Sequence, residues 1–226
     1  MHNFELFGAP HLLSFVTILS AASILIVLYR RHSRLQKTIR YGLATCTLLS
    51  YPLHIALASI FSYQLDLETT LPLHLCDLAA IFGGTALFTK SQKLAEITYF
   101  WGLAATLQGL LTPDIQHSFP NPEFIAFFWN HGFVVITALF LPLAMAWRPR
   151  VKAHWYVFGM TQIYLILALT VNFSLGTNYG YLHHKPSTAS LLDYLPVWPG
   201  YILFLEILCL AFFLLLSLPF STKSEK

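Results

Sequence analysis

The chain has few charged residues for its length. Charged side chains make up 10% of its 226 residues, against roughly 25% in an ordinary soluble domain. Its 13 Lys and Arg exceed its 10 Asp and Glu by only three, and no basic patch alternates with aromatic residues. The composition therefore excludes an ordinary soluble domain and argues against nucleic acid as a partner.

Cysteine is also scarce. The three cysteines, Cys46, Cys76 and Cys209, are scattered and form no CxxC pair, so neither a disulfide framework nor a structural zinc site is expected. A hydrolytic metal site built from the available histidines and aspartates would lack HExxH-type spacing. We therefore expect no metal and no other cofactor.

Long apolar runs occupy most of the sequence. A helix needs about 20 apolar residues to cross a bilayer, because backbone groups cannot stay unpaired in hydrocarbon. Seven runs approach this length: 9–29, 41–63, 71–88, 94–111, 124–147, 155–175 and 200–220. The sequence predicts an all-α polytopic membrane protein, a bundle of about seven transmembrane helices forming one membrane-embedded domain over residues 1–226.

The basic residues lie almost entirely in alternate connections between these runs. Segments 30–40, 90–93, 148–152 and 223–226 hold twelve of the thirteen, and Lys185 is the exception. The positive-inside rule makes that side cytoplasmic. An odd number of spans then places the N-terminus outside and the C-terminus inside, in a multi-pass protein of the plasma membrane.

Polar residues inside the runs concentrate in the outer half of the predicted membrane. Ionisable side chains at such positions are costly and mark function by default. At about 1.5 Å per residue, the polar group of run 71–88 lies roughly 5–9 Å below its outer end, and that of run 124–147 about 9–11 Å. The residues sharing this level are His74, Cys76, Asp77, Gln108, Asn130, His131 and Asn172.

Each of these residues also has a structural interpretation. A lone cysteine in a membrane helix is usually an apolar filler, His74 and Asp77 at i and i+3 can bond each other, and amides can join helices. Convergence of several runs at one depth instead predicts a polar cavity near the outer face. Two functions remain open: an enzyme, or a non-enzymatic sensor, scaffold or small-ligand binding protein.

Four segments carry a family resemblance. LPLHLCDLAAIF from Leu71, YFWGLAATLQGLLTPD from Tyr99, FFWNHG from Phe127 and the segment that begins NFSLGTNYGYLHHKP at Asn172 resemble the YwaF-like bacterial integral membrane proteins. That family is related to a eukaryotic transmembrane acyltransferase that remodels ether phospholipids. The resemblance implies a cysteine that carries the acyl group, Cys76, and an assisting histidine on a later span, His131. His74 is a rival for the histidine role.

The residues fit that chemistry. A thiol is mostly protonated at neutral pH, so a nucleophilic cysteine needs a neighbouring base. Attack on a phospholipid ester would give a thioester through an oxyanion, which the amides of Gln108, Asn130 or Asn172 would stabilise, with His74 and Asp77 orienting the site. The sequence therefore predicts a phospholipid acyltransferase or acyl hydrolase whose partners are membrane phospholipids or lysophospholipids.

Overall fold

The computed structural model describes residues 3–61, 67–186 and 191–221. Within these ranges every element is helical, apart from an isolated β-bridge between Asn3 and His117. The all-α prediction is confirmed. The main helices are α1 (Ala9–Arg31), α2 (Gln36–Leu48), α3 (Ser50–Phe61), α4 (Leu67–Thr70), α5 (Leu75–Thr89), α6 (Gln92–Trp101), α7 (Leu107–Leu111), α8 (Pro122–Ala144), α9 (Ala153–Leu175) and α10 (Gly200–Ser221).

Shorter elements complete the chain. A π-helical segment, η2 (Gly102–Thr106), joins α6 to α7, so helix continues from Gln92 to Leu111. Single helical turns occur at η1 (Ser33–Leu35), η3 (Tyr179–Tyr181) and η4 (Leu191–Tyr194).

Four helices of the described chain are long and apolar enough to cross a membrane: α1, α8, α9 and α10. The helical stretch ending in α2 and the helix α3 pass the same test together, as a pair bent by 48°. The other two predicted runs correspond to α5, which has 15 residues, and to the α6–η2–α7 stretch. The count of seven spans stays a prediction.

Three predicted boundaries need correction. Run 41–63 is broken at Leu49, because Pro52 lacks an N–H and its ring would clash with the Leu48 carbonyl of a continuous helix; Tyr63 lies outside the described residues. Run 71–88 becomes helical only at Leu75. Run 124–147 stops at Ala144, and Ala146 adopts a left-handed φ of 54°.

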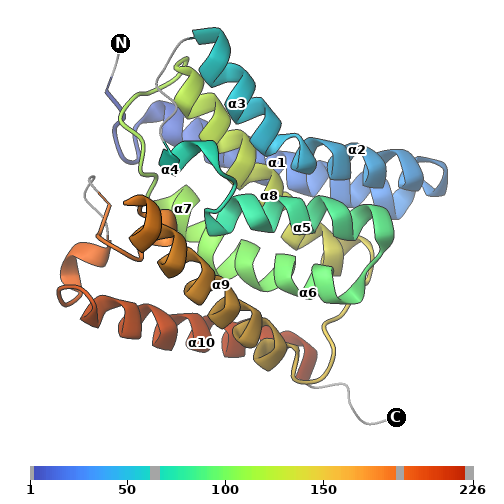
Figure 1. Cartoon of the computed structure of the whole chain (residues 1–226). Helices are drawn as coiled ribbons and strands as arrows, with labels where there is room; N and C mark the ends of the chain where they lie inside the picture. Colours follow the sequence, from blue (N-terminus) through green and yellow to red (C-terminus); the bar gives the residue numbers. More distant parts are fainter. Residues whose placement is uncertain (1–2, 62–66, 187–190, 222–226) are drawn as a thin grey trace.

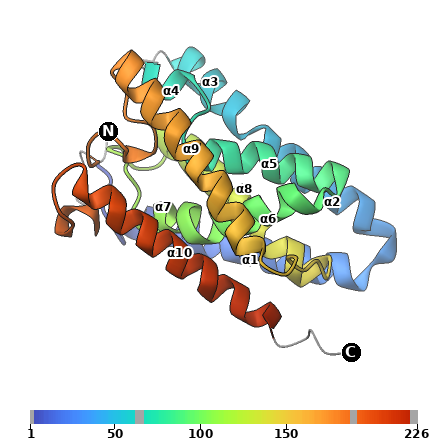
Figure 2. The same ribbon diagram turned by 60° about the horizontal axis from the view of Figure 1, so that its bottom comes forward.

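Helix α8 is the centre of the bundle. It contacts α1, α2, α3, α5, α6, η2 and α7. Of the residues in its most apolar stretch, 67% are buried, against 6% for α1 and 11% for α10. Figures 1 and 2 show α10 and α1 at the outside of the bundle. The apolar faces of these outer helices are suited to lipid contact.

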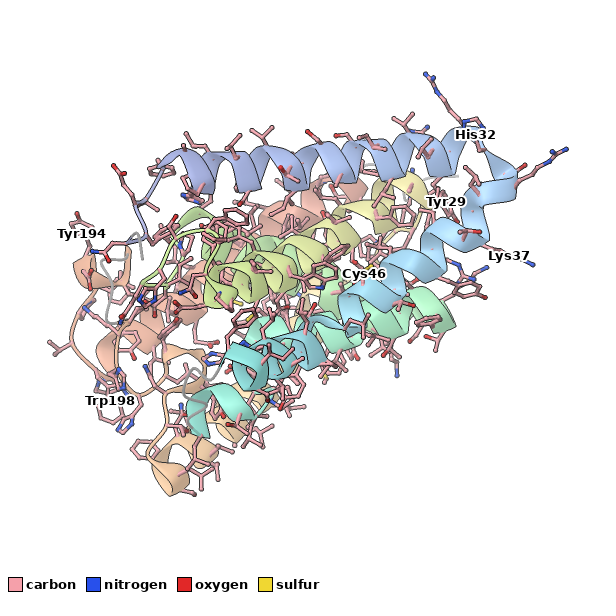
Figure 3. The ribbon with its side chains drawn as sticks, turned by 90° about the horizontal axis from the view of Figure 1, so that it is seen from above. Tyr29, His32, Lys37, Cys46, Tyr194 and Trp198 are labelled. Carbon is pink, nitrogen blue, oxygen red and sulfur yellow. The ribbon has the colours of Figure 1, made fainter. Side chains whose placement is uncertain are left out.

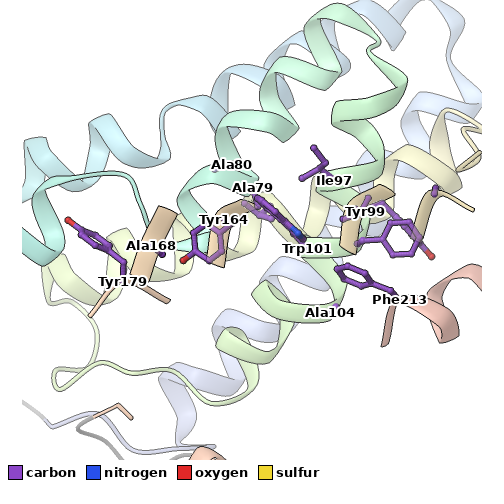
Figure 4. Close-up of a cluster of buried hydrophobic side chains, with 14 of the residues drawn as sticks. Ala79, Ala80, Ile97, Tyr99, Trp101, Ala104, Tyr164, Ala168, Tyr179 and Phe213 are labelled. Atoms are coloured by element: carbon purple, nitrogen blue, oxygen red, sulfur yellow. The ribbon is translucent and has the colours of Figure 1, made fainter. Parts of the chain in front are cut away.

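Close approach of helices fixes the position of α5. A Cβ added at Gly84 would lie 2.4 Å from Leu48 Cγ and 2.8 Å from the Ala44 carbonyl oxygen, so only glycine permits this α5–α2 contact. Next to it, α6, α9 and α10 share a core whose aromatic side chains include Tyr179, Tyr164, Trp101 and Tyr99 (Figure 4). Trp101 also donates from Nε1 to Thr161 Oγ1 at 2.9 Å.

The two ends of the bundle differ in character. Tyr29, His32 and Lys37 lie at one end and Tyr194 and Trp198 at the other (Figure 3). The basic connections α1–α2, α5–α6 and α8–α9 gather at the first end, and segments 112–121, 176–186 and 191–199 at the second (Figure 1). Lys223 and Lys226, two of the twelve basic residues counted in the sequence, lie outside the described residues.

Candidate functional site

The candidate site begins at the N-terminus of α5. His74 is the N-cap residue, and Cys76 and Asp77 are the second and third residues of the helix. The side chain of Asp77 hydrogen-bonds the backbone of His74, which is the contact that the third helical residue makes in a capping box. Because the helix starts at Leu75 rather than Leu71, these residues lie in its first turn and not in its second.

Asp77 also joins α5 to α8. Asn130 donates from Nδ2 to Asp77 Oδ1 at 2.6 Å. Asn130 is only 9% exposed, so the bond lies between helices and not at a wet surface. Since Cys76 precedes Asp77 and His131 follows Asn130, this one hydrogen bond brings the two predicted catalytic segments together.

His131 is held in a defined orientation. Its Nδ1 lies 3.0 Å from the carbonyl oxygen of Phe127, and since a carbonyl only accepts, Nδ1 carries the proton. The ring also stacks on Phe127, with centroids 3.9 Å apart and planes at 18°. In the neutral imidazole Nε2 is therefore the unprotonated nitrogen and is available as an acceptor or base.

The Nε2 edge of His131 faces α7. A Cβ added at Gly109 would lie 2.9 Å from Nε2 and 2.8 Å from Cδ2, so the helix passes the imidazole at the closest distance that a residue without a side chain allows. Gln108, half-buried, directly precedes this contact. The imidazole of His131 also interacts electrostatically with His74.

Cys76 is partly buried beneath residues of α9 and of the following segment. The Tyr164 hydroxyl donates to the Leu73 carbonyl at 3.1 Å and interacts electrostatically with Cys76 and Asp77. Gly180 adopts a φ of +67°, and a Cβ there would lie 2.5 Å from the Tyr164 hydroxyl oxygen. Residues 177–182 therefore pack directly over the start of α5.

Asn172 fixes that covering segment. It is fully buried, donates from Nδ2 to the Tyr179 carbonyl at 3.0 Å, and accepts at Oδ1 from the Tyr179 amide at 2.7 Å and Thr177 Oγ1 at 3.0 Å. The Tyr179 ring in turn lies 5.1 Å from the ring of His74. Asn172 thus holds the cover through these local contacts.

Three residues of the site escaped the sequence analysis: Gly109, Phe127 and Tyr164. Phe127 precedes His131 by four residues, a helical spacing at which side chains meet, and an isolated glycine inside a helical run usually has a packing reason. Tyr164 had no comparable signal, because its contact with Leu73 joins distant parts of the chain. No group of three or more His, Cys, Asp or Glu in the described ranges is arranged to hold a metal ion.

Comparison with known proteins gives one match. The model of the TMEM164 family matches residues 6–217, a range that contains α5, α7, α8 and α9 and so every residue of the candidate site. No curated protein and no solved structure matches the chain. Because the family model covers nearly the whole sequence, the chain belongs to the TMEM164 family.

Proposed function

We propose that this membrane protein is a phospholipid acyltransferase or acyl hydrolase, with Cys76 as nucleophile and His131 as base. The observation that carries the proposal is the 2.6 Å hydrogen bond between Asp77 and Asn130. It ties the residue after Cys76 to the residue before His131. The unprotonated Nε2 of His131 supplies the proton acceptor that a thiol needs.

The proposed reaction has two halves. The Cys76 thiol transfers its proton to His131 Nε2 and attacks the ester carbonyl of a membrane phospholipid, so that a C–S bond forms and the ester C–O bond breaks. The departing lysophospholipid alkoxide takes the proton from the imidazolium. A hydroxyl-bearing acceptor then attacks the thioester, forms a new C–O bond and releases the thiolate, which recovers a proton.

The oxyanion of each half-reaction needs hydrogen-bond donors. Cys76 lies in the first turn of α5, and the first amides of a helix have no intrahelical partner and carry the positive end of its dipole. We assign the oxyanion to the amides of Leu75 and Cys76, since the Asp77 amide donates to the His74 carbonyl at 3.0 Å, and we add the Gln108 side chain as a further donor. The amide nitrogen of Asn130 is already bonded to Asp77, so it orients the site instead.

The proposal includes a membrane arrangement. It places seven spans in the plasma membrane, with the N-terminus and connections 112–121 and 176–199 outside and the C-terminus in the cytoplasm. The family match and the four apolar helices support a membrane location. The seven spans, their orientation and the more specific YwaF-like resemblance remain predictions.

The test is capture of the acyl-enzyme. Purified protein in phospholipid vesicles is incubated with a phospholipid that carries a radiolabelled acyl chain, and we expect a protein-bound label that hydroxylamine releases. Cys76→Ser should abolish the adduct, while Cys46→Ser should retain it. If the wild-type protein binds lipid without forming any adduct, the alternative of a sensor or ligand-binding protein is favoured instead.

A further inference from the structure

Three buried side-chain atoms of the described residues have no hydrogen-bond partner: Ser50 Oγ, Thr106 Oγ1 and Asn130 Oδ1. A buried polar atom without a partner destabilises a protein, so most such atoms are bonded to protein or to water. Each of the three therefore needs an explanation. The explanation for Asn130 is different in kind from the other two.

Local backbone geometry accounts for Ser50 and Thr106. Serine and threonine in these helices commonly donate to the carbonyl four residues earlier, as Thr98 does to Leu94 at 2.8 Å. For Ser50 that carbonyl belongs to Cys46, which lies across the helix break at Leu49 and accepts from Trp129 Nε1 at 3.0 Å. For Thr106 it belongs to Gly102, which accepts the Leu107 amide that closes the π turn.

No such local cause applies to Asn130. Its Nδ2 donates to Asp77 Oδ1, so the amide nitrogen faces Asp77 and the carbonyl oxygen points away from it. Asp77 is itself fixed by the His74 backbone. The Oδ1 oxygen of Asn130 is therefore held in place without a hydrogen-bond donor, where α5 meets α8. The residue that carries it is only 9% exposed.

A second acceptor stands on the next residue. His131 uses its Nδ1 proton on Phe127, which leaves Nε2 with a lone pair. These two acceptors stand on consecutive residues, next to the segment that carries Cys76, and a ligand with two hydrogen-bond donors would satisfy both. A nucleophile with a single hydroxyl proton satisfies only one of them.

We propose that Asn130 Oδ1 and His131 Nε2 together bind the acyl acceptor, and that this acceptor carries two donors: water, or a lipid with a second hydroxyl beside the attacking one. The inference rests on the proposed function. The attacking oxygen bonds to the thioester carbonyl carbon, the C–S bond breaks, and the attacking hydroxyl proton passes to His131 Nε2 and then to the Cys76 thiolate. The second hydrogen stays bonded to Asn130 Oδ1.

Matched acceptors test the inference. Protein labelled at Cys76 with a radioactive acyl chain is offered a monoalkylglycerol, which has two adjacent hydroxyls, or its terminal methyl ether, which has one. We expect the wild-type protein to prefer the diol by about tenfold or more, as for sites that lose a hydrogen-bonded partner. Acylated alkylglycerol as product identifies a lipid acceptor, and free fatty acid identifies water.

Asn130→Leu should reduce the preference for the diol to about one and slow the release of fatty acid by a similar factor. Asn130→Leu also removes the hydrogen bond to Asp77, so discharge is measured as a rate per labelled protein, and we expect it to fall by a larger factor than labelling does. Asn130→Ser, a smaller change that keeps a hydroxyl oxygen at reduced reach, should fall between the two proteins. Thr106→Val is the matched control, since it removes an unpartnered buried hydroxyl that has a local cause, and it should keep the full preference.

The outcomes separate this inference from the proposed function. A wild-type protein that forms no acyl adduct contradicts the proposed function itself. A wild-type protein that forms the adduct but accepts the diol and the methyl ether equally contradicts the inference alone. An Asn130→Leu protein whose adduct discharges at the wild-type rate, with the wild-type preference for the diol, also contradicts the inference. The same holds for an Asn130 variant in which labelling and discharge fall by the same factor.

Discussion

The imidazole of His131 lies against the backbone of Gly109, so close that a Cβ at position 109 would stand 2.9 Å from Nε2. The ring cannot easily turn away, because it is stacked on Phe127 and bonded to the Phe127 carbonyl. Helix α7 therefore forms one wall of the site and sets where the proposed base can be. Gly109 is not one of the polar residues from which the sequence predicted the site. Its contact with His131 therefore gives an independent test of the histidine's role.

Gly109→Ala should lower acyl transfer sharply while leaving the protein folded. The new methyl group pushes the imidazole out of place, and a misplacement of about 1 Å can cost about 100-fold in rate. The stability loss is partly offset, because alanine favours helix over glycine by about 1 kcal/mol. Transfer rate and melting temperature are measured together. The control is Gly159→Ala in α9, where an added Cβ meets nothing within 4 Å; equal rates in the two variants would contradict the assignment.

A second prediction concerns the basic end of the bundle. Arg150 binds Glu96 through Nη2 at 2.6 Å and Nε at 2.9 Å, and its side chain is 46% exposed whereas Glu96 is fully buried. Arg150→Ala leaves that carboxylate without its cation, and we expect a loss of about 3 kcal/mol in the free energy of unfolding. Adding Glu96→Gln should recover much of the loss, because the buried charge is then gone.

The control for this pair is Arg148→Ala. Position 148 contributes its backbone carbonyl, which accepts from Gln92 Nε2 at 2.8 Å, and alanine keeps that carbonyl. We expect little change in the unfolding free energy. If Arg148→Ala and Arg150→Ala are equally destabilised, the ion pair is not the source of the effect.

Sequence reasoning reached the helices whose apolar runs are long. Helix α8 covers most of its predicted run and begins at Pro122, with Asn121 accepting the Glu123 amide at 2.8 Å as an N-cap. The break at Leu49 was also encoded, since Pro52 stands three residues later, but hydropathy alone merged the two halves. The late start of α5 at Leu75 shows the same limit. An apolar run marks what lies in lipid and not where backbone hydrogen bonding begins.

The site was harder to predict than the helices. Depth arithmetic grouped Asp77 with Asn130, and these two residues are bonded. It also grouped Asn172, whose amide binds Thr177 and Tyr179. Depth gives a residue's level along a helix but not the direction of its side chain, and direction depends on contacts between distant segments. For the same reason the close contact between Gly109 and His131 could not be predicted from the sequence.

Asn172→Ala should loosen the cover over α5. The substitution removes three hydrogen bonds that fix residues 177–179, and we expect a loss of about 2 kcal/mol, since buried carbonyl and amide groups lose their partner. Cleavage between residues 176 and 186 by an added protease should become faster. Thr170→Ala, which removes only an exposed bond to the Ile166 carbonyl, is the control and should be cleaved at the wild-type rate.

The orientation of the chain is tested by reporter fusions. The seven-span arrangement puts twelve of the thirteen basic residues on one side. A reporter that works only in the cytoplasm should then be active when fused after Lys226 and inactive when inserted in segment 112–121. Activity at both positions would mean that they lie on the same side and that the number of spans between them is even. That result would remove the seven-span arrangement.

The final prediction separates the two roles in the proposed catalytic pair. His131→Ala should lower acyl transfer by about 10²–10⁴-fold, the usual contribution of a general base. It should also slow alkylation of Cys76 at neutral pH, because the thiol then lacks an acceptor for its proton. Raising the pH should restore part of that alkylation, because hydroxide then removes the thiol proton in place of the imidazole.

Two comparisons make this result specific. His74→Ala tests the rival histidine, and the larger loss of transfer identifies the base. Cys46 and Cys209, alkylated in the same samples, report general access of the reagent and should not respond to His131→Ala. If Cys76 reacts no faster than Cys46 in the wild-type protein, and His131→Ala changes neither rate, then Cys76 is not an activated nucleophile. The Asp77–Asn130 pair would then be better explained as part of a ligand-binding pocket, since its geometry does not depend on a thiolate.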